Sequence, residues 1–252
     1  MKVTAIVQAR MGSARLSGKV LFTVKNKPLL LYEIERLQKS KNIKNIIIAT
    51  SELPIDDPIE DFCRYHDVLI FRGSETDVLD RYYKAASQYQ AKHIMRITGD
   101  CPLIEPDVCD LIVEEYFSNN VDYVRTGQSF AEGLDCEVVS FAALEKSWKE
   151  AELSSEREHV TLYINNHSEL FSFFIMENDI DDSWIRITVD NSEDFEVIRH
   201  IIKKLQENEL TLENIRLFLL NNPEILQINS NIIRNEGLLK SLNQDKKVTT
   251  NS

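Results

Sequence analysis

VTAIVQARMGSARLSGK, residues 3–19, joins an apolar segment to a basic, glycine-containing loop. The apolar part, residues 3–9, is short and rich in β-branched side chains, which predicts a buried strand. No Asp or Glu occurs between Met1 and Tyr32, although the chain as a whole is acidic. The cations of this region form either a local anion site or a basic surface face that acids elsewhere balance. They are Lys2, Arg10, Arg15, Lys19, Lys25 and Lys27.

Strand-like and helix-like segments alternate through the first half of the chain. Each helix-like segment is long enough to cross over between two parallel strands. The pattern therefore predicts an α/β fold of the Rossmann-like kind, built on a mostly parallel sheet with helices on its faces. After the first strand, strands are expected at 45–50, 68–71 and 93–98, and helices at 28–39, 58–66 and 76–90.

Beyond Pro102 the regular alternation ends. We interpret residues 1–228 as one domain. The polar residues 229–252 are expected to form a tail that is loosely packed or is borrowed by a partner subunit. In this half, strands are expected at 122–126, 136–140, 171–176 and 185–189, and helices at 107–117, 141–150, 156–167, 193–206 and 212–220.

The composition argues against several classes of protein. A chain of 252 residues with 43% hydrophobic and 28% charged residues is typical of a globular protein. No apolar run of about 18 residues occurs, so we expect no membrane span. The N-terminus lacks a secretory cleavage site, which indicates a cytoplasmic location. A net charge of −12 argues against a nucleic-acid partner, and the four cysteines have neither zinc-site nor disulfide spacing.

The basic loop after the first strand has the composition of a phosphate-binding loop. Its glycines let backbone amides approach phosphate oxygens, and its cations can neutralise a triphosphate. It is not a Walker loop, because five residues separate Gly12 from Gly18 and Val20 stands where magnesium-binding Ser or Thr would be. The candidate phosphate contacts are Ala9, Arg10, Met11, Gly12, Ser13, Arg15 and Lys19.

Several motifs together resemble one enzyme family. They are AIVQARMGSARLSGKVL with KPLL, then RITGDCPLI, EGLDCEVVSF, SEREHVTLYI and TVDNSEDFEVI. Over roughly residues 1–240 they are similar to the CMP-sugar synthetase group, and within it to the spore-coat polysaccharide cytidylyltransferase-like family. The resemblance implies a nucleotidyltransferase fold with a mixed sheet of about seven strands, commonly a homodimer. It also implies transfer of CMP from CTP to a small acceptor in surface polysaccharide assembly.

Two aspartates are candidate ligands of Mg²⁺. Asp100 lies in the turn TGDCP, and Asp190 follows the segment ITV, each where a strand is expected to end. Mg²⁺ needs few carboxylates because water and phosphate oxygens complete its octahedron. The resemblance places the metal carboxylates of the family at these two positions. The alternative is that each aspartate caps the helix that follows it.

The remaining site predictions concern the base and the acceptor. Ser74, Arg81 and Arg96 are candidate contacts of CTP, although Ser74 and Arg81 also fit the start of a surface helix. The irregular stretch at about 126–168 is expected to serve the acceptor or the dimer contact. The candidate acceptor contacts there are Glu132, Asp135, Arg157 and His159.

The expected reaction is an in-line attack of an acceptor oxygen on the α-phosphorus of CTP, which needs positioning and charge stabilisation. The catalytic set is Arg10, Arg15, Lys19, Asp100 and Asp190, and the acceptor is a sugar acid or a phosphorylated metabolite. One alternative is a transferase that consumes nucleotide sugars, but it would need a DxD motif, which Asp-Cys-Pro at 100–102 does not supply. Another is a non-catalytic nucleotide-binding protein, for which loss of part of the set is expected.

Overall fold

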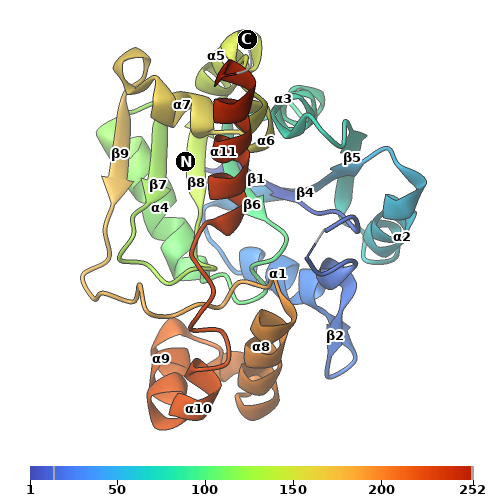
Figure 1. The fold of residues 1–252 in the computed structure, drawn as a ribbon, viewed down its shortest axis with the longest axis vertical. Helices are drawn as coiled ribbons and strands as arrows, with labels where there is room; N and C mark the ends of the chain where they lie inside the picture. Colours follow the sequence, from blue (N-terminus) through green and yellow to red (C-terminus); the bar gives the residue numbers. More distant parts are fainter. Residues whose placement is uncertain (14, 251–252) are drawn as a thin grey trace.

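A seven-stranded mixed sheet forms the centre of the molecule (Figure 1). The computed structural model describes residues 1–13 and 15–250, and for 247–250 the backbone alone. The strand order is β5-β4-β1-β6-β8-β7-β9, and only β8 runs antiparallel to its neighbours in this sheet. The strands are β1 (Val3–Gln8), β4 (Ile43–Ser51), β5 (Leu69–Gly73), β6 (His93–Thr98), β7 (Tyr123–Thr126), β8 (Glu137–Ser140) and β9 (Phe173–Met176), while β2 (Thr23–Val24) and β3 (Lys27–Pro28) pair separately.

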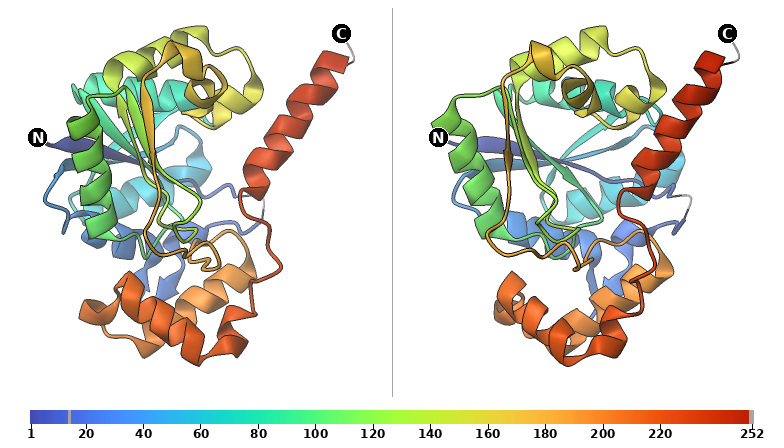
Figure 2. Two further views of the ribbon diagram at one scale, coloured as in Figure 1. Left: turned by 90° about the vertical axis from the view of Figure 1, so that its left-hand side faces the viewer. Right: turned by 60° about the vertical axis from the view of Figure 1, so that its left-hand side comes forward.

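Apolar side chains on both faces of the central strands make two cores. In β1, Ala5 and Val7 belong to one core and Ile6 to the other, as the alternation of a strand requires. This two-sided burial is typical of parallel strands and explains their continuous apolar runs. Helices α1 (Leu29–Leu37), α2 (Asp57–Tyr65) and α4 (Pro106–Asn119) cover the first face, and α3 (Val78–Gln88), α5 (Phe141–Glu150) and α7 (Leu162–Asn166) cover the second (Figure 2).

The C-terminal part adds helices beyond one end of the sheet. Helices α8 (Ser192–Lys204), α9 (Leu212–Asn221) and α10 (Pro223–Leu226) extend the first core. The chain then turns back, and α11 (Glu236–Thr250) runs along the molecule to contact α6 (Ser154–Glu158), as Figure 1 shows. Residues 229–246 contact the same chain through α6, but most of their side chains are exposed or only partly buried, and the expectation of a tail that is loosely packed or borrowed by a partner subunit stays a prediction.

Two predicted elements differ from the structure. Residues 185–189 are not a strand, although their apolar side chains are buried. Their backbone bonds go to two loops, since the Ile187 amide donates to Glu132 and the Val189 amide donates to Asp100. The single helix expected at 156–167 is divided into α6 and α7, and Val160 between them has a positive φ of 33°.

The expectation of free thiols agrees with the structure. All four cysteines are buried free thiols, and burial raises the pKa of Cys63 to about 12. Among the residues that the structure describes, no helix is both long and apolar enough to cross a membrane.

Candidate active site

A cavity of about 600 Å³ opens beyond the carboxyl ends of β1 and β6. These strands are parallel neighbours, with Gln8 opposite Thr98, so the loops that follow them lie side by side. Gly99 makes this approach possible, because a Cβ atom there would lie 3.0 Å from the Gln8 carbonyl oxygen. Ligand crevices form at this edge of an open α/β sheet because the strand ends converge there.

Lys19 lies at the centre of a charged cluster in this cavity. Its Nζ is 2.9 Å from Asp100 Oδ2 and 2.9 Å from Asp190 Oδ1, and Arg15 Nη2 is 2.6 Å from the same Asp190 oxygen. Burial would lower the pKa of Lys19, but the two carboxylates raise it overall. Burial would likewise raise the pKa of Asp100, but Lys19 and Thr98 lower it overall. Lys19 and Asp100 are therefore both charged at neutral pH.

Neither aspartate caps a helix. Glu105 is the N-cap residue of α4, and Asn191 is the N-cap residue of α8. Asp194, the third residue of α8, accepts the hydrogen bond from the Asn191 amide at 3.0 Å, which completes a capping box without Asp190. The structure thus leaves one oxygen of each carboxylate directed at Lys19, inside the cavity.

The converging carboxylates fit a divalent cation. Asp100 and Asp190 present hard oxygen ligands to one point, at which a cation, the Lys19 ammonium, already lies. Mg²⁺ prefers such ligands and takes further oxygens from water and phosphate. No group of three or more His, Cys, Asp or Glu side chains suited to a metal occurs in the described part of the chain. By this geometry, Asp100 and Asp190 are the residues that could hold Mg²⁺.

The phosphate-binding loop divides into residues that line the cavity and residues that shape the loop. Ala9, Arg10 and Ser13 line it, as do Arg15 and Lys19. Within the described residues Arg10 forms no ion pair, so its charge is available to a ligand. Met11 and Gly12 lie outside the lining. The Met11 amide donates to Asp56 Oδ1 at 2.6 Å, and the Met11 carbonyl accepts from the Gly18 amide.

Of the other predicted nucleotide contacts, Arg81 and Arg96 line the cavity and Ser74 does not. Ser74 has a local structural role, because its hydroxyl accepts from the Asp77 amide and its carbonyl accepts from Arg81 Nη1. Arg96 pairs with Glu137 at 3.0 Å. The two arginines contribute positive charge to the cavity wall from α3 and β6.

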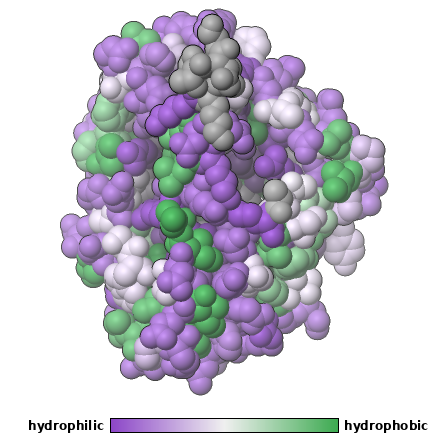
Figure 3. Space-filling view, viewed as in Figure 1, coloured by the Kyte–Doolittle hydropathy of each residue, from purple (hydrophilic) through white to green (hydrophobic). Residues whose placement is uncertain are grey.

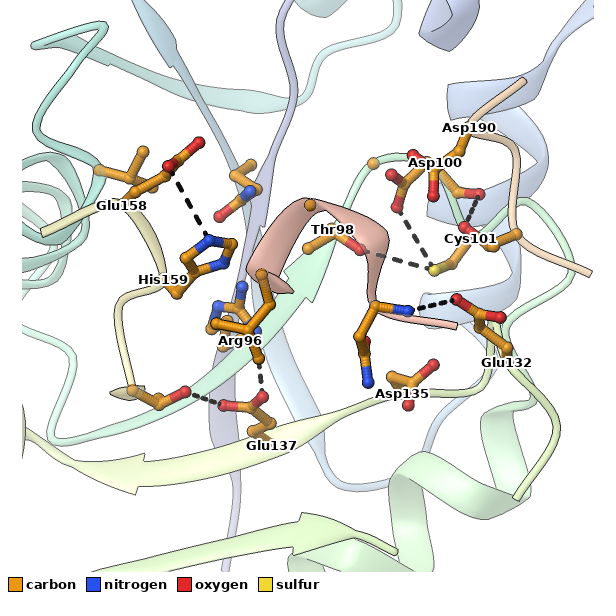
Figure 4. A pocket seen from close by; sticks show the side chains of 18 of the residues that line it. Arg96, Thr98, Asp100, Cys101, Glu132, Asp135, Glu137, Glu158, His159 and Asp190 are labelled. Carbon is orange, nitrogen blue, oxygen red and sulfur yellow. Dashed lines mark hydrogen bonds and ion pairs between the residues drawn. The ribbon is translucent and has the colours of Figure 1, made fainter. Parts of the chain in front are cut away.

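Three of the four predicted acceptor contacts line the cavity (Figure 4). Glu132 and Asp135 are already paired, with Arg186 at 2.5 Å and Arg234 at 2.9 Å. His159 Nε2 lies 3.0 Å from Ser241 Oγ. Burial lowers the pKa of His159, so the imidazole is neutral near pH 7.

Arg157, the fourth predicted acceptor contact, lies outside the cavity lining. Its Nε is 3.0 Å from both carboxylate oxygens of Asp77, and its Nη1 donates to the Trp148 carbonyl at 2.6 Å. These bonds tie α6 to α3 and α5. The structure therefore places Arg157 in the packing between helices and not in the cavity lining.

Comparison with known proteins decides the family. Residues 4–232 match the family described as cytidylyltransferase. The chain belongs to this family. It is 42% identical to an uncharacterized protein of Methanocaldococcus jannaschii, over 92% of this chain and 96% of that one. It is 35% identical to the spore coat polysaccharide biosynthesis protein SpsF of Bacillus subtilis, over 87% and 94%. A solved cytidylyltransferase from Leptospira borgpetersenii superposes with a TM-score of 0.85 at 36% identity, covering 90% of this chain and 97% of that one.

The structure of this cytidylyltransferase adds site residues that the sequence analysis missed. Arg125 lines the cavity from β7, and within the described residues it forms no ion pair. Residues 234–238, just before and within α11, line the cavity as well, and Glu236 pairs with Arg15 at 2.7 Å. No local pattern marks these residues, because only the return of the C-terminal segment brings them to the site. Arg186 could have been found from the sequence, because it stands four residues before Asp190, a spacing at which an arginine and an aspartate can pair.

Proposed function

We propose that this cytidylyltransferase transfers CMP from CTP to a small anionic acceptor, a sugar acid or a phosphorylated metabolite, with release of pyrophosphate. The observation that carries the proposal is the convergence of Lys19 and Arg15 with Asp100 and Asp190 in one cavity. The family match supports CTP as the donor. The name of the Bacillus subtilis relative supports a role in surface glycan assembly. We also propose that the protein is cytoplasmic, that it forms a homodimer and that it uses Mg²⁺.

The proposed chemistry is one displacement at phosphorus. An acceptor oxygen forms a bond to the α-phosphorus, the bond from that phosphorus to the oxygen bridging to the β-phosphate breaks, and pyrophosphate leaves with its electron pair. Bound Mg²⁺ would supply neutralisation of phosphate charge. Arg10, Arg15 and Lys19 would bind the phosphates and stabilise the charge that develops on the leaving group, which is where preorganised cations are most effective.

The first prediction is that Asp100→Asn and Asp190→Asn each lower kcat by about 100-fold or more, because each substitution removes one of the two carboxylates proposed to hold the metal. The measurement is pyrophosphate release from each of the four nucleoside triphosphates with Mg²⁺. It uses a panel of sugar acids, sugar phosphates and other phosphorylated metabolites as acceptors. We expect release with CTP and one class of acceptor.

Asp110→Asn is the matched control for these variants. Asp110 is buried on α4 outside the cavity and accepts from Ser40 and from two backbone amides. This variant should lose stability and keep its kcat. Near-normal turnover by Asp190→Asn would contradict the metal assignment. Activity with a different nucleoside triphosphate in place of CTP would contradict the proposed donor.

A further inference from the structure

Arg186 lies directly behind Asp190 and outside the cavity lining. Its side chain is 8% exposed, and three carboxylates surround it. Its Nε and Nη2 bind Asp194 at 2.7 and 3.0 Å as a two-pronged contact. Its Nη2 also lies 3.2 Å from Asp190 Oδ2. Only a planar guanidinium can make all these contacts at once, since a lysine ammonium is a single point of charge.

Asp194 provides the fixed point of this network. Its side chain is fully buried. Its oxygens accept from Arg186, from Asn229 Nδ2 at 3.0 Å and from the backbone amides of Asp190 and Asn191 at 3.0 Å. Asp194 therefore holds both the backbone of Asp190 and the guanidinium behind it.

The two oxygens of Asp190 face different groups. Oδ2 faces Arg186, whereas Oδ1 faces Lys19 at 2.9 Å and Arg15 at 2.6 Å inside the cavity. A hydrogen bond to Oδ2 from behind restricts rotation of the carboxylate and leaves Oδ1 as the oxygen presented to a ligand. Groups behind a metal ligand orient it in this way in other metal sites.

We propose that Arg186 is the positioning residue that directs Asp190 Oδ1 into the cavity, and that Asp194 and Asn229 hold Arg186 in place. The inference rests on the proposed function, in which Asp190 holds a divalent cation. Arg186 also pairs with Glu132, which lines the cavity. The same guanidinium thus links the candidate metal carboxylate to a candidate acceptor contact.

The test compares Arg186→Lys with Arg216→Lys in the full-length protein. Both lysines keep the positive charge and lose a two-pronged contact with a fully buried aspartate, because Arg216 binds Asp182 at 2.7 and 2.6 Å. Neither Arg216 nor Asp182 lines the cavity. Binding of Mn²⁺, with and without CTP, is measured by electron paramagnetic resonance. The Mg²⁺ concentration that gives half-maximal pyrophosphate release is measured beside it.

Arg186→Lys should weaken Mn²⁺ binding and raise the required Mg²⁺ by about 10- to 100-fold, with little change in the KM for CTP at saturating Mg²⁺. Arg216→Lys should lower the Tm and leave metal binding unchanged. Equal Mn²⁺ binding by the two variants would overturn the inference. If Arg186→Lys does not fold, Asn229→Ala is the second test. This variant removes one hydrogen-bond donor to Asp194 and should also weaken Mn²⁺ binding. Unchanged Mn²⁺ binding by Asn229→Ala would overturn the inference.

The failure of the inference and the failure of the proposed function give different results. A wild-type protein that binds Mn²⁺ with CTP but releases no pyrophosphate with any acceptor contradicts the proposed function, while the Mn²⁺ comparison still tests Arg186. A wild-type protein that binds no Mn²⁺ even with CTP overturns the inference.

Discussion

Glu33 is a buried carboxyl group beside the charged cluster. It lies on α1 with no exposed surface, and neither of its side-chain oxygens has a side-chain hydrogen-bond partner among the described residues. Burial raises the pKa of Glu33 well above its ordinary value, and the charge of Asp100 adds to this effect. Burial outweighs the attraction of Lys19, so the carboxyl group is neutral in the folded state, because ionisation would place a charge where water cannot solvate it.

The protonation of Glu33 predicts a specific pH dependence of stability. The folded state keeps the proton that the unfolded state releases above about pH 4.5, so wild-type stability should fall as pH rises from there towards the folded-state pKa. Glu33→Gln has no ionisable group at position 33. The free energy of unfolding of the variant, relative to that of the wild type, should therefore rise between pH 5 and pH 8. Urea unfolding at several pH values measures this difference. Parallel pH profiles for the two proteins would show that Glu33 does not keep its proton.

At the scale of elements, α11 forms part of the cavity wall. The segment before it is attached through Arg234, which donates to the carbonyls of Gln128 and Phe130 at 3.0 Å. Glu236 at its start pairs with Arg15, and Ser241 hydrogen-bonds to His159. Since Arg15 is a proposed phosphate contact, the carboxylate of Glu236 and the triphosphate would compete for the same guanidinium.

Glu236→Gln should therefore tighten CTP binding, by about two- to fivefold, because a partly exposed ion pair contributes little. Isothermal titration calorimetry of the full-length protein with CTP measures the change. Lys240→Gln is the matched control, since Lys240 is the other cationic partner of Glu236 at 2.7 Å. It should leave the affinity unchanged or slightly lower. A Glu236→Gln protein with wild-type affinity would mean that α11 does not restrain Arg15.

At the scale of the whole molecule, the cavity is less acidic than the chain around it. The chain carries a net charge of −12, whereas basic and acidic side chains balance in the cavity lining, where Arg10 and Arg125 form no ion pair within the described residues. Hydrophilic residues dominate the face across which α11 runs (Figure 3). An acidic surface disfavours polyanions, which need an extended basic surface, and the arginines without an ion pair are where a small anion would meet positive charge.

The prediction at this scale concerns assembly. We expect a homodimer, so light scattering after size exclusion should give twice the mass of one chain at micromolar concentration. The same mass should persist at about 0.5 M NaCl if apolar contacts hold the subunits together, because salt screens exposed charges. The mass of a single chain at all concentrations would contradict the expected dimer.

The sequence by itself determined the order and type of most elements and indicated the candidate site residues. Residues 3–9, 76–90 and 141–150 carry periodicities that are local, so burial of one face or of both can be predicted without a partner. The basic loop and the turn at Asp100 were likewise visible, because strand ends followed by glycine have a local signature. These predictions needed no knowledge of which segments meet in space.

The tertiary structure alone decided which of these residues lie together. Residues 185–189 have the composition of a strand, but their backbone bonds go to two loops instead of a sheet. Arg157 lies outside the cavity because Asp77 and Trp148 bind its guanidinium. Arg186 lies behind Asp190 and Asp194, which are near it in the chain, but its pairing with Glu132 depends on the tertiary structure. Ion pairs and cavity walls depend on side chains that folding brings together, and these long-range contacts cannot be predicted from local periodicity.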